Sequence, residues 1–592
     1  MLLRSYTYFF ILALFCFFKL SSIESYRVCF EGNLSPQLKK LLESASDTVK
    51  LQDSPPATVA GLKHRAEADV KNFLKVLHSQ ALYNATVNLD YQLNTCPAIV
   101  LVKVNPGPVY PLTGFYIVPS NDSLCRNFNY SSISLTDLKV NLYCPATPKM
   151  IVEAEENLLF LMAKQGYPLA TIKDRDVTAD QNQQGIIVTL HVDSGPQAYF
   201  GETAFKGLCS VKEIYVIKKL AWCQGAIYDP CKVQRTYSAL EAIGLFSSIN
   251  ITYAQELNDC QQLPMQIEVI EGKQRSIGAG LAYSTDWGPG ASFEWEHRNI
   301  GGMGEKLSFD LGVWQALQKA NLRYIKPDFL KPNQDLVWIA QALHDKTKGY
   351  HETSFSISGL LEKQLSSRVR ISYGGMYKIL NDTDSVPNGS FNLLKAPFYL
   401  RYSNVNNILD PTIGTTVHLR VIPSWQFIKK QFVYCINTMN STFYYPLTCD
   451  HQYVLAGQFR FGTILGSNRR TLPASERFYE GSDNSMRGFR FLTVSPLNHK
   501  HKPIGGRSLM TYSLELRGRA TKNWGWVAFY DFGNVYSSIL PNFNRRLLQS
   551  VGAGIRYHTP VGPLRLDVAV PLTPRSHVDH KFQVYLSIGQ AF

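Results

Sequence analysis

One short stretch of the sequence combines residue types that could anchor a loop by charge. The run EGSDNSMRGFRF, residues 480–491, places Arg487, Gly488 and Phe489 in succession between segments with strand-like alternation. An arginine guanidinium is planar and carries five donors in a fixed fork, which suits carboxylate binding. Glycine lets the backbone approach closely or take a positive φ angle, and phenylalanine can wedge against a wall. The sequence therefore predicts a loop anchor with an acidic partner elsewhere in the chain.

Sites for catalysis, cofactors or metals do not stand out elsewhere in the sequence. The chain has no GxSxG run, Walker motif or dinucleotide fingerprint. Two histidine pairs, His499 with His501 and His577 with His580, lie in loop-like runs without a third ligand nearby, so solvated turns are favoured over metal binding. We therefore expect no enzymatic activity, no cofactor and no metal.

The N-terminal residues and the composition indicate export to a membrane. Arg4 precedes an apolar run from Tyr8 to Phe18, which predicts a removed signal peptide over residues 1–24 rather than a spanning anchor, because the run is short. Charged residues make up 18% of the chain and aromatic residues 12%, an aromatic excess that suits membrane-interface belts. The net charge is +14, but export removes the opportunity to meet nucleic acid, so no nucleic-acid partner is expected.

Residues 25–273 contain an internal repeat. Three times a segment with helical spacing of apolar residues precedes a segment with alternation, and a second strand with a turn glycine follows, at Gly107, Gly195 and Gly272. This pattern predicts three small β-α-α-β-β units, over residues 25–105, 106–197 and 198–273.

The pattern changes from residue 274 to residue 592, where helical periodicity fades. Short alternating runs take over: in LMTYSLELR, Leu514 and Leu516 share one face, while Glu515 and Arg517 share the other. An apolar face, a polar face and no helix left to cover a sheet together favour a lipid-facing barrel with a wet lumen. The length suits about 16 antiparallel strands.

Ten cysteines follow the predicted signal peptide, and an even number behind an export signal favours disulfides over metal sites. Their distribution lets each repeat close its own pairs, with the pairing inside the third repeat left open. Another bridge is expected to pinch an extracellular hairpin of the barrel between its last two cysteines. The ten candidates are Cys29, Cys96, Cys125, Cys144, Cys209, Cys223, Cys231, Cys260, Cys435 and Cys449.

The combined pattern resembles the outer-membrane assembly superfamily of BamA and TamA. The chain ends in an alternating strand with the terminal aromatic Phe592, and RFYEGSDNSMRGFRF matches the family's Arg-Gly-Phe/Tyr loop motif. IGAGLAYSTDWGP, FYDFGNV and VGPLRLDVAVPL match in the same order. The resemblance implies α+β periplasmic POTRA repeats, three of them, followed by a 16-stranded antiparallel transmembrane β-barrel over residues 274–592. Three repeats favour a TamA-like member.

The resemblance also implies site residues. The family's acidic partners of Arg487 correspond to Glu515 and Asp531. The seam between the first and last strands is expected to be weak, because glycine weakens a strand interior. The seam candidates are Gly278, Gly280, Gly589 and Phe592.

The function that the resemblance implies is assistance in inserting or secreting β-barrel and autotransporter-type proteins through that seam, in a bacterial outer membrane. The expected partners are unfolded outer-membrane protein substrates, outer-membrane lipid and a TamB-like inner-membrane-anchored protein. Two alternatives stay open: a dedicated secretion pore of the two-partner type, and a passive channel or surface receptor.

Overall fold

The computed structural model of the chain describes residues 25–120, 128–180, 185–284, 287–383, 387–428, 430–542, 546–559, 562–588 and 590–592. The predicted signal peptide and Cys125 lie outside these ranges. Two compact units emerge. The first comprises residues up to Lys206 with 219–240 and 249–268, and the second comprises 207–218, 241–248 and 269–592.

Three small mixed sheets precede the large sheet, and each holds three strands. In the first, β1 pairs parallel to the central β3, which pairs antiparallel to β2. The helices of this repeat begin at hydroxyl caps: Ser35, Ser46 and Thr58 each accept a hydrogen bond from a first-turn N–H. The elements are β1 (Tyr26–Glu31), α2 (Pro36–Ala45), α3 (Asp47–Lys50), α4 (Val59–Ser79), β2 (Thr86–Gln92) and β3 (Ala98–Asn105).

The second and third sheets repeat this order, as β4-β6-β5 and β7-β9-β8. The described part of the second repeat has one α-helix and a single 3-10 turn, rather than the two helices expected. The elements are β4 (Leu112–Pro119), η2 (Tyr130–Ser132), α5 (Pro148–Lys164), β5 (Thr171–Asp180), β6 (Gly185–Asp193), β7 (Tyr199–Lys206), α6 (Glu213–Ile217), α7 (Pro230–Ile243), β8 (Phe246–Tyr253) and β9 (Gln262–Glu271).

Each of the first two repeats buries one face of its long helix. In α4, Leu62, Ala66, Phe73 and Leu77 are buried in one cluster with the inward side chains of β3. Their successive spacings of four, seven and four residues place them on one helix face. The core of each repeat therefore lies between its sheet and its helices.

Asp69 is a buried acidic residue on α4 that fixes the neighbouring helix α3. Its carboxylate accepts hydrogen bonds from the Ser46 hydroxyl at 2.7 Å and from the backbone N–H groups of Asp47 and Thr48 at 3.0 and 2.8 Å. Burial raises the pKa of Asp69, but hydrogen bonds from Thr48 and Ser46 outweigh it and hold the pKa below its ordinary value.

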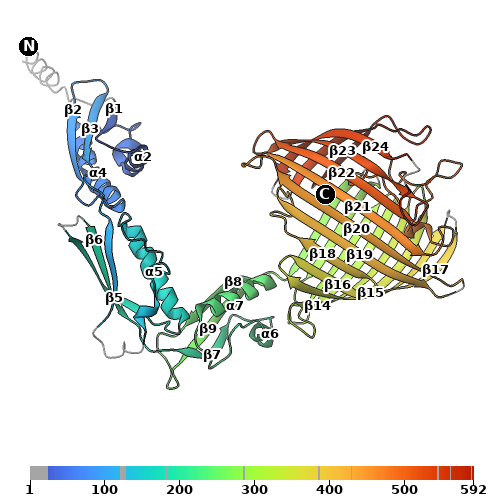
Figure 1. Cartoon of the computed structure of the whole chain (residues 1–592), viewed down its shortest axis with the longest axis horizontal. Helices are drawn as coiled ribbons and strands as arrows, with labels where there is room; N and C mark the ends of the chain where they lie inside the picture. The colour runs from blue at the N-terminus through green and yellow to red at the C-terminus, as the bar shows by residue number, and fades with distance from the viewer. Residues whose placement is uncertain are drawn as a thin grey trace, which may run out of the picture. The chain divides into compact units, whose positions relative to one another are not determined.

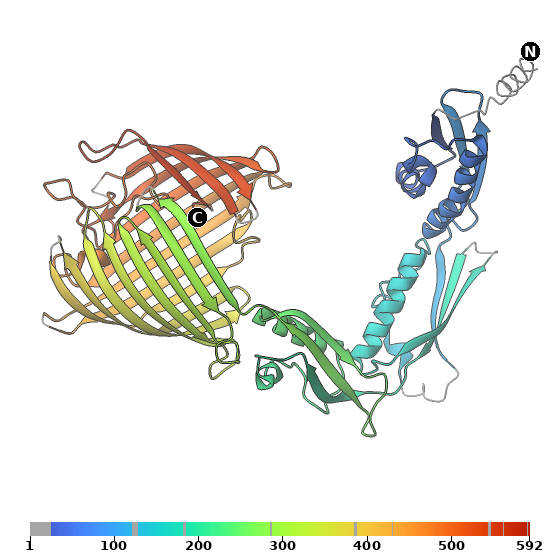
Figure 2. The ribbon, with the colours of Figure 1, turned by 180° about the vertical axis from the view of Figure 1, so that it is seen from behind.

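The second unit is dominated by one antiparallel sheet of 17 strands in sequence order, β10 to β26, which curls into a barrel (Figures 1 and 2). The strands are β10 (Arg275–Ser284), β11 (Gly288–His297), β12 (Lys306–Trp314), β13 (Leu317–Lys326), β14 (Gln334–Lys346), β15 (His351–Ser366), β16 (Val369–Thr383), β17 (Gly389–Lys395), β18 (Phe398–Ser403), β19 (Gly414–Gln426), β20 (Phe432–Pro446), β21 (Tyr453–Gly466), β22 (Ser508–Arg519), β23 (Trp524–Tyr536), β24 (Leu548–Thr559), β25 (Gly562–Pro571) and β26 (Gln583–Ile588).

Two of these strands share one position in the sheet. β17 and β18 both pair with β16 on one side and with β19 on the other. The break between them holds Pro397, which has no N–H to give to a ladder. The 17 strands thus fill 16 positions, the number that the sequence predicts. No pairing between β10 and β26 is present among the described residues.

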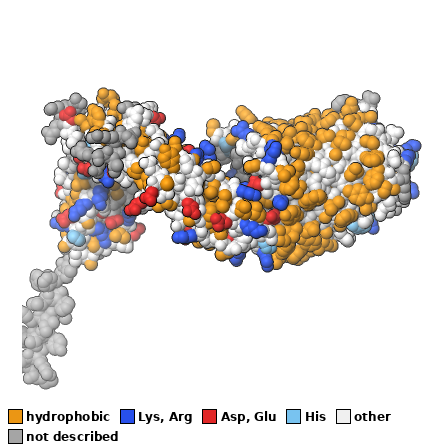
Figure 3. Space-filling view, turned by 90° about the horizontal axis from the view of Figure 1, so that it is seen from below, with side chains coloured by type: hydrophobic (Ala, Val, Ile, Leu, Met, Phe, Trp, Pro, Cys, Tyr) orange, Lys and Arg blue, Asp and Glu red, His pale blue; other side chains and the backbone are white. Residues whose placement is uncertain are grey.

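Side chains alternate between the two faces of this sheet. In β22, Ser513 and Glu515 are buried, whereas Leu514 and Leu516 are 42% and 36% exposed. In β25 the four exposed side chains are all aliphatic: Leu564, Leu566, Val568 and Val570. Hydrophobic side chains gather over the outer surface of the barrel in Figure 3. An apolar exterior with polar side chains inside is the pattern of a barrel in lipid. Within the described ranges, none of the helices has the length and hydrophobicity to cross a bilayer.

Candidate functional site

The long loop 467–507 between β21 and β22 folds against the inner wall of the barrel. Short bridges hold its own halves together, between Phe478 and Gly506 and between Glu480 and Val494. Met486, Phe489 and Val494 are buried in a cluster with side chains of β22, β23 and β24. The loop is therefore a packed element of the barrel interior.

Arg487 is almost completely buried at the centre of this loop. Its Nε and Nη2 donate to both carboxylate oxygens of Asp531 at 2.8 Å, and its Nη1 donates to Glu515 Oε1 at 2.5 Å. The backbone N–H of Arg487 also donates to Asp531, at 3.0 Å. The guanidinium lies 3.5 Å from the ring centroid of Phe529. The structure thus brings together Arg487, Glu515 and Asp531, the three charged residues that the resemblance implied.

A third carboxylate, Asp567 of β25, completes a charge network that the sequence reasoning missed. Asp567 lies 3.7 Å from Arg487, 2.5 Å from Arg556 and 3.6 Å from Arg565. Glu515 in turn pairs with Arg517 at 2.8 Å. Since Glu515, Asp531 and Asp567 are all fully buried, the surrounding arginines supply the compensation that buried charges require. Alternation in LRLDV was the available signal, because it places Arg565 and Asp567 on one face.

Gly488 and Phe489 connect the loop to the last strand. The N–H of Gly488 donates to the Tyr585 hydroxyl at 3.0 Å, and that hydroxyl donates to the carbonyl of Phe489 at 3.2 Å. Gly488 has a φ of 91°, and an added Cβ would lie 3.0 Å from Cβ of Ser550. The glycine is therefore needed for both conformation and space. Tyr585 belongs to β26, so the motif links β22 and β23 to the edge strand.

Three acidic residues of the loop itself form ion pairs with cations on the inner wall of the barrel. Glu476 pairs with Lys378 at 3.1 Å and with Lys395 at 2.6 Å. Glu480 pairs with Arg460 at 2.8 Å. Asp483 pairs with Arg565, also at 2.8 Å. The loop is thus held on β16, β17, β21 and β25 by its acids, and on β22 and β23 by its arginine.

The predicted seam residues fall in different places. Gly278 and Gly280 lie on β10, and added Cβ atoms would meet only Glu294 and Ser292 of β11. On the same strand Ile277 and Leu281 are 72% and 90% exposed. Gly589 lies outside the described residues. The first strand therefore carries an unusually exposed apolar face.

Phe592 is the exception among the predicted seam residues, because it does not lie on a strand. Arg517 Nη2 donates to its carbonyl at 3.2 Å, and the guanidinium lies 5.2 Å from its ring centroid. The ring packs near Tyr444, Val454 and Ala456. These partners belong to β20, β21 and β22, so placing Phe592 on the last strand was wrong. β26 ends at Ile588, and the final residue turns to the inside of the sheet.

The disulfide prediction is not supported for the nine cysteines that the structure describes, all of which are free thiols. These are Cys29, Cys96, Cys144, Cys209, Cys223, Cys231, Cys260, Cys435 and Cys449. Cys29 is opposite Leu101 in the parallel pair of β1 and β3, and roughly 10 Å of strand separates that position from Ala98, where β3 begins after Cys96. A disulfide needs Cα atoms within about 7 Å.

The expected hairpin between Cys435 and Cys449 was wrong for a related reason. The residues between them form β20, a single strand of 15 residues that pairs with β19 and β21. Cys435 lies near the start of this strand and Cys449 lies past its end. Along a strand their separation is roughly 40 Å, too far for a bridge.

Glu271 joins the end of β9 to a loop within the second unit. Its carboxylate accepts from the backbone N–H groups of Cys209 and Val211 at 2.9 Å and from that of Ser210 at 3.0 Å. Burial raises the pKa of Glu271, but hydrogen bonds from Ser210 and Val211 outweigh it and lower the pKa below its ordinary value. The Lys212 N–H donates to the Gly302 carbonyl at 2.8 Å. This loop is therefore tied both to β9 and to the β11–β12 turn.

Comparison with known proteins finds a family match in the C-terminal half of the chain. Residues 299–592 match the Omp85 superfamily domain. The chain is 23% identical over 470 residues to an outer membrane protein assembly factor BamA of Nitratidesulfovibrio vulgaris, covering 75% of this chain and 57% of the relative. It is 20% identical to that of Neisseria meningitidis, covering 72% and 60%. The chain thus spans less than two thirds of the length of these curated relatives.

A solved structure has a similar fold. BamA from Haemophilus ducreyi lacking POTRA domains 1–3 superposes with a TM-score of 0.70 at 19% identity. The match covers 80% of this chain and 99% of that one.

Proposed function

Residues 299–592 belong to the Omp85 superfamily, and on that premise we propose that the protein is an outer-membrane assembly factor. It lies in a bacterial outer membrane, with its three repeats in the periplasm. It would assist β-barrel and autotransporter-type proteins to enter the bilayer or to cross it, without nucleotide hydrolysis. The BamA names of its relatives support this activity.

The observation that carries the proposal is the link between the buried loop and the edge strand. Tyr585 of β26 is bonded through its hydroxyl to Gly488 and Phe489, while the adjacent Arg487 is bonded to β22 and β23. β26 pairs with β25 over six residues only. The loop would therefore set the position of a short edge strand whose ladder alone holds it weakly.

A weakly held edge offers a route for substrate strands. β10 pairs with β11 through all ten of its residues, so it is firmly held and can present its other edge. Free N–H and C=O groups on such an edge template an incoming strand by β-augmentation. We propose a 16-stranded barrel that closes between β10 and β26 and opens there sideways, with the substrate's own folding as the drive.

The proposed partners follow from the same geometry. Unfolded outer-membrane proteins would be the substrates, and outer-membrane lipid would contact the apolar exterior. Each repeat sheet has two edge strands, such as β1 and β2 around β3, which could dock extended chains. A TamB-like inner-membrane-anchored protein is the proposed partner of the repeats.

Depletion of the protein tests the proposed function against its alternatives. Loss of many barrel proteins from the outer membrane supports general assembly. Loss of one exported protein indicates a dedicated secretion pore. No change in either would reject both and favour a passive channel or receptor.

Crosslinking across the seam tests the lateral route. Cysteines introduced for Ile277 on β10 and for Leu586 on β26, in a background without the native cysteines, should lock the seam and block assembly until reduced. A second pair of cysteines, introduced for Ile277 and Trp295, is the matched control. These two residues face each other on β10 and β11, so this crosslink should leave assembly intact. Full activity with a fully formed seam crosslink would reject the route.

A further inference from the structure

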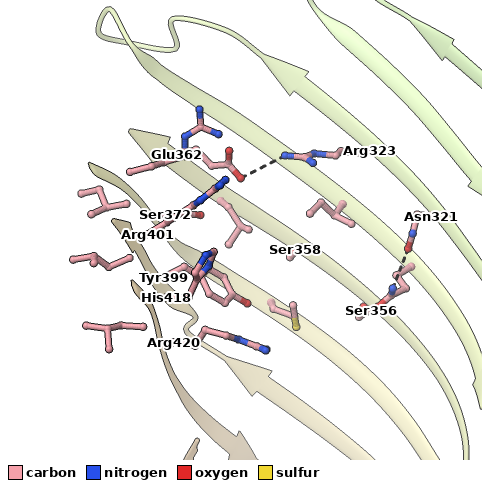
Figure 4. A pocket seen from close by; sticks show the side chains of 18 of the residues that line it. Asn321, Arg323, Ser356, Ser358, Glu362, Ser372, Tyr399, Arg401, His418 and Arg420 are labelled. Atoms are coloured by element: carbon pink, nitrogen blue, oxygen red, sulfur yellow. Dashed lines mark hydrogen bonds and ion pairs between the residues drawn. The ribbon is translucent and has the colours of Figure 1, made fainter. Parts of the chain in front are cut away.

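A cavity of about 600 Å³ lies in the inner wall of the barrel, over strands β12 to β16, β18 and β19 (Figure 4). Its lining includes no residue of the loop motif at 480–491, and the proposed function does not use it. Its lining residues alternate with outward apolar ones: Leu322 beside Arg323 is 46% exposed, and Tyr373 beside Ser372 is 42% exposed. The charged and polar side chains of the lining therefore face the lumen.

The cavity is strongly cationic. It is lined by five basic side chains, Lys319, Arg323, Arg370, Arg401 and Arg420, and by two acidic ones, Asp310 and Glu362. Among the residues that the structure describes, Arg323 alone of the five forms an ion pair, with Glu362 at 3.5 Å. The charged side chains of the lining therefore have a net charge of +3 when His418 is neutral.

The strand register places two like charges, Arg370 and Arg401, directly opposite each other and a neutral histidine next to them. Arg370 of β16 faces Arg401 of β18, and Arg401 faces His418 of β19. Like charges at facing positions destabilise a sheet, because their Cβ atoms are only about 5 Å apart. Among the described residues, the Arg370 side chain donates only to a neutral partner, Gln364, at 2.8 Å. In the protein without a ligand, the two facing arginines repel each other, and because both are exposed, only solvent in the lumen screens that repulsion.

Further donors and an apolar surface surround the two facing arginines. Tyr399 and Ser372 line the same cavity, and Figure 4 shows Tyr399, Arg401, His418 and Arg420 along one side of it. Ile339, Leu360 and Met376 add apolar lining. Hydroxyl and guanidinium donors together suit a tetrahedral oxyanion.

We propose that this cavity binds a phosphate-bearing ligand. Three excess positive charges match a phosphate monoester of charge near −2 better than a single carboxylate. The cavity is larger than a bare phosphate needs, and its apolar lining leaves room for the group that carries the phosphate. The phosphate comes from either of two sources, a free phosphate compound or a lipid headgroup.

Calorimetric titration of the full-length protein in nanodiscs at 150 mM salt tests the site. The probes are inorganic phosphate and glycerol 3-phosphate, with hexaglutamate as the carboxylate probe. We expect the two phosphate probes to bind and Arg401→Ala to weaken them at least tenfold. Arg401→Lys should restore part of the affinity. Arg368→Ala is the matched control, since Arg368 is an exposed arginine just before β16 that does not line the cavity.

Thermal unfolding separates a binding role from a structural one. Without ligand, Arg401→Ala should unfold at the same temperature as the wild type or higher, because it removes the facing charges. With phosphate, only the wild type and the control should gain stability. A gain in stability from phosphatidic acid in the nanodisc, without added phosphate, assigns the lipid headgroup as the source, and a gain from the soluble probes alone assigns a free phosphate compound.

Three results would overturn the proposal. These are no binding of either phosphate probe to the wild type, equal binding by Arg401→Ala and the control, and tighter binding of hexaglutamate than of phosphate. The last result would assign the cavity to acidic peptide.

Discussion

Replacing Arg487 by alanine tests how much the buried loop depends on one side chain. The change removes three hydrogen bonds to two fully buried carboxylates. Glu515 keeps a cation, because Arg517 lies 2.8 Å away. Asp531 keeps no ion pair among the described residues. An uncompensated buried charge costs about 3–5 kcal/mol, and we expect Arg487→Ala to destabilise the barrel by that amount.

A double-mutant cycle isolates the pair from other losses. Asp531→Asn alone should cost about 1–3 kcal/mol, because it weakens the bonds but keeps the shape. The double variant leaves neither charge unpaired. Its loss of stability should therefore be about 2 kcal/mol smaller than the sum of the two single losses. Urea unfolding in lipid vesicles, followed by heat-modifiable migration on gels, measures all four proteins.

A neighbouring arginine provides the control for this cycle. Among the described residues, the Arg490 side chain makes one hydrogen bond, a long one of 3.4 Å to the carbonyl of Val578, so Arg490→Ala should change stability by no more than about 0.5 kcal/mol. A coupling energy below about 0.5 kcal/mol, or equal losses for the two arginines, would refute the charge-anchor reasoning.

Three further predictions concern other contacts. Tyr585→Phe removes the hydroxyl shared by the loop and β26 and leaves a buried N–H unpaired, so it should cost about 1–3 kcal/mol and loosen the edge strand, as seen by hydrogen exchange of β26; unchanged exchange would contradict the link. Gly488→Ala adds a tight contact to a positive φ angle and should cost more than Gly225→Ala, which has a φ of 80° but open space; equal losses of stability would remove the packing argument. The lowered pKa of Asp69 means that its carboxylate stabilises the fold above about pH 4 and that this contribution is lost as the pH falls through the folded-state pKa; hydrogen exchange at α3 should rise on acidification, and Asp69→Asn should abolish that dependence.

The alternation of polar and apolar residues made much of the barrel predictable. A side-chain period of two fixes which residues face inward, so Glu515 and Leu514 were assigned to opposite faces correctly. Asp531 was harder, because Phe529 and Val527 share its side. The structure resolves the difficulty: both are buried, and Phe529 lies under the guanidinium of Arg487.

Long-range pairings could not be read from the sequence. Glu476 meets Lys378 and Lys395 because a loop of many residues folds back across several strands, and no local pattern encodes that path. The cysteine count failed for the opposite reason. An even number behind an export signal is a statistical indication, and it carries no distance, whereas a bridge between Cys435 and Cys449 is forbidden by the length of β20.

The inward turn of the last residue has a practical consequence for work on this protein. Phe592 is held by Arg517, which also holds Glu515 of the buried charge network. A purification tag fused after Phe592 would have to pass through the space beside Arg517, and it would disturb the charges around the loop anchor. In the unfolded chain the same phenylalanine has none of these contacts, so the environment of its ring reports whether the barrel has folded around it.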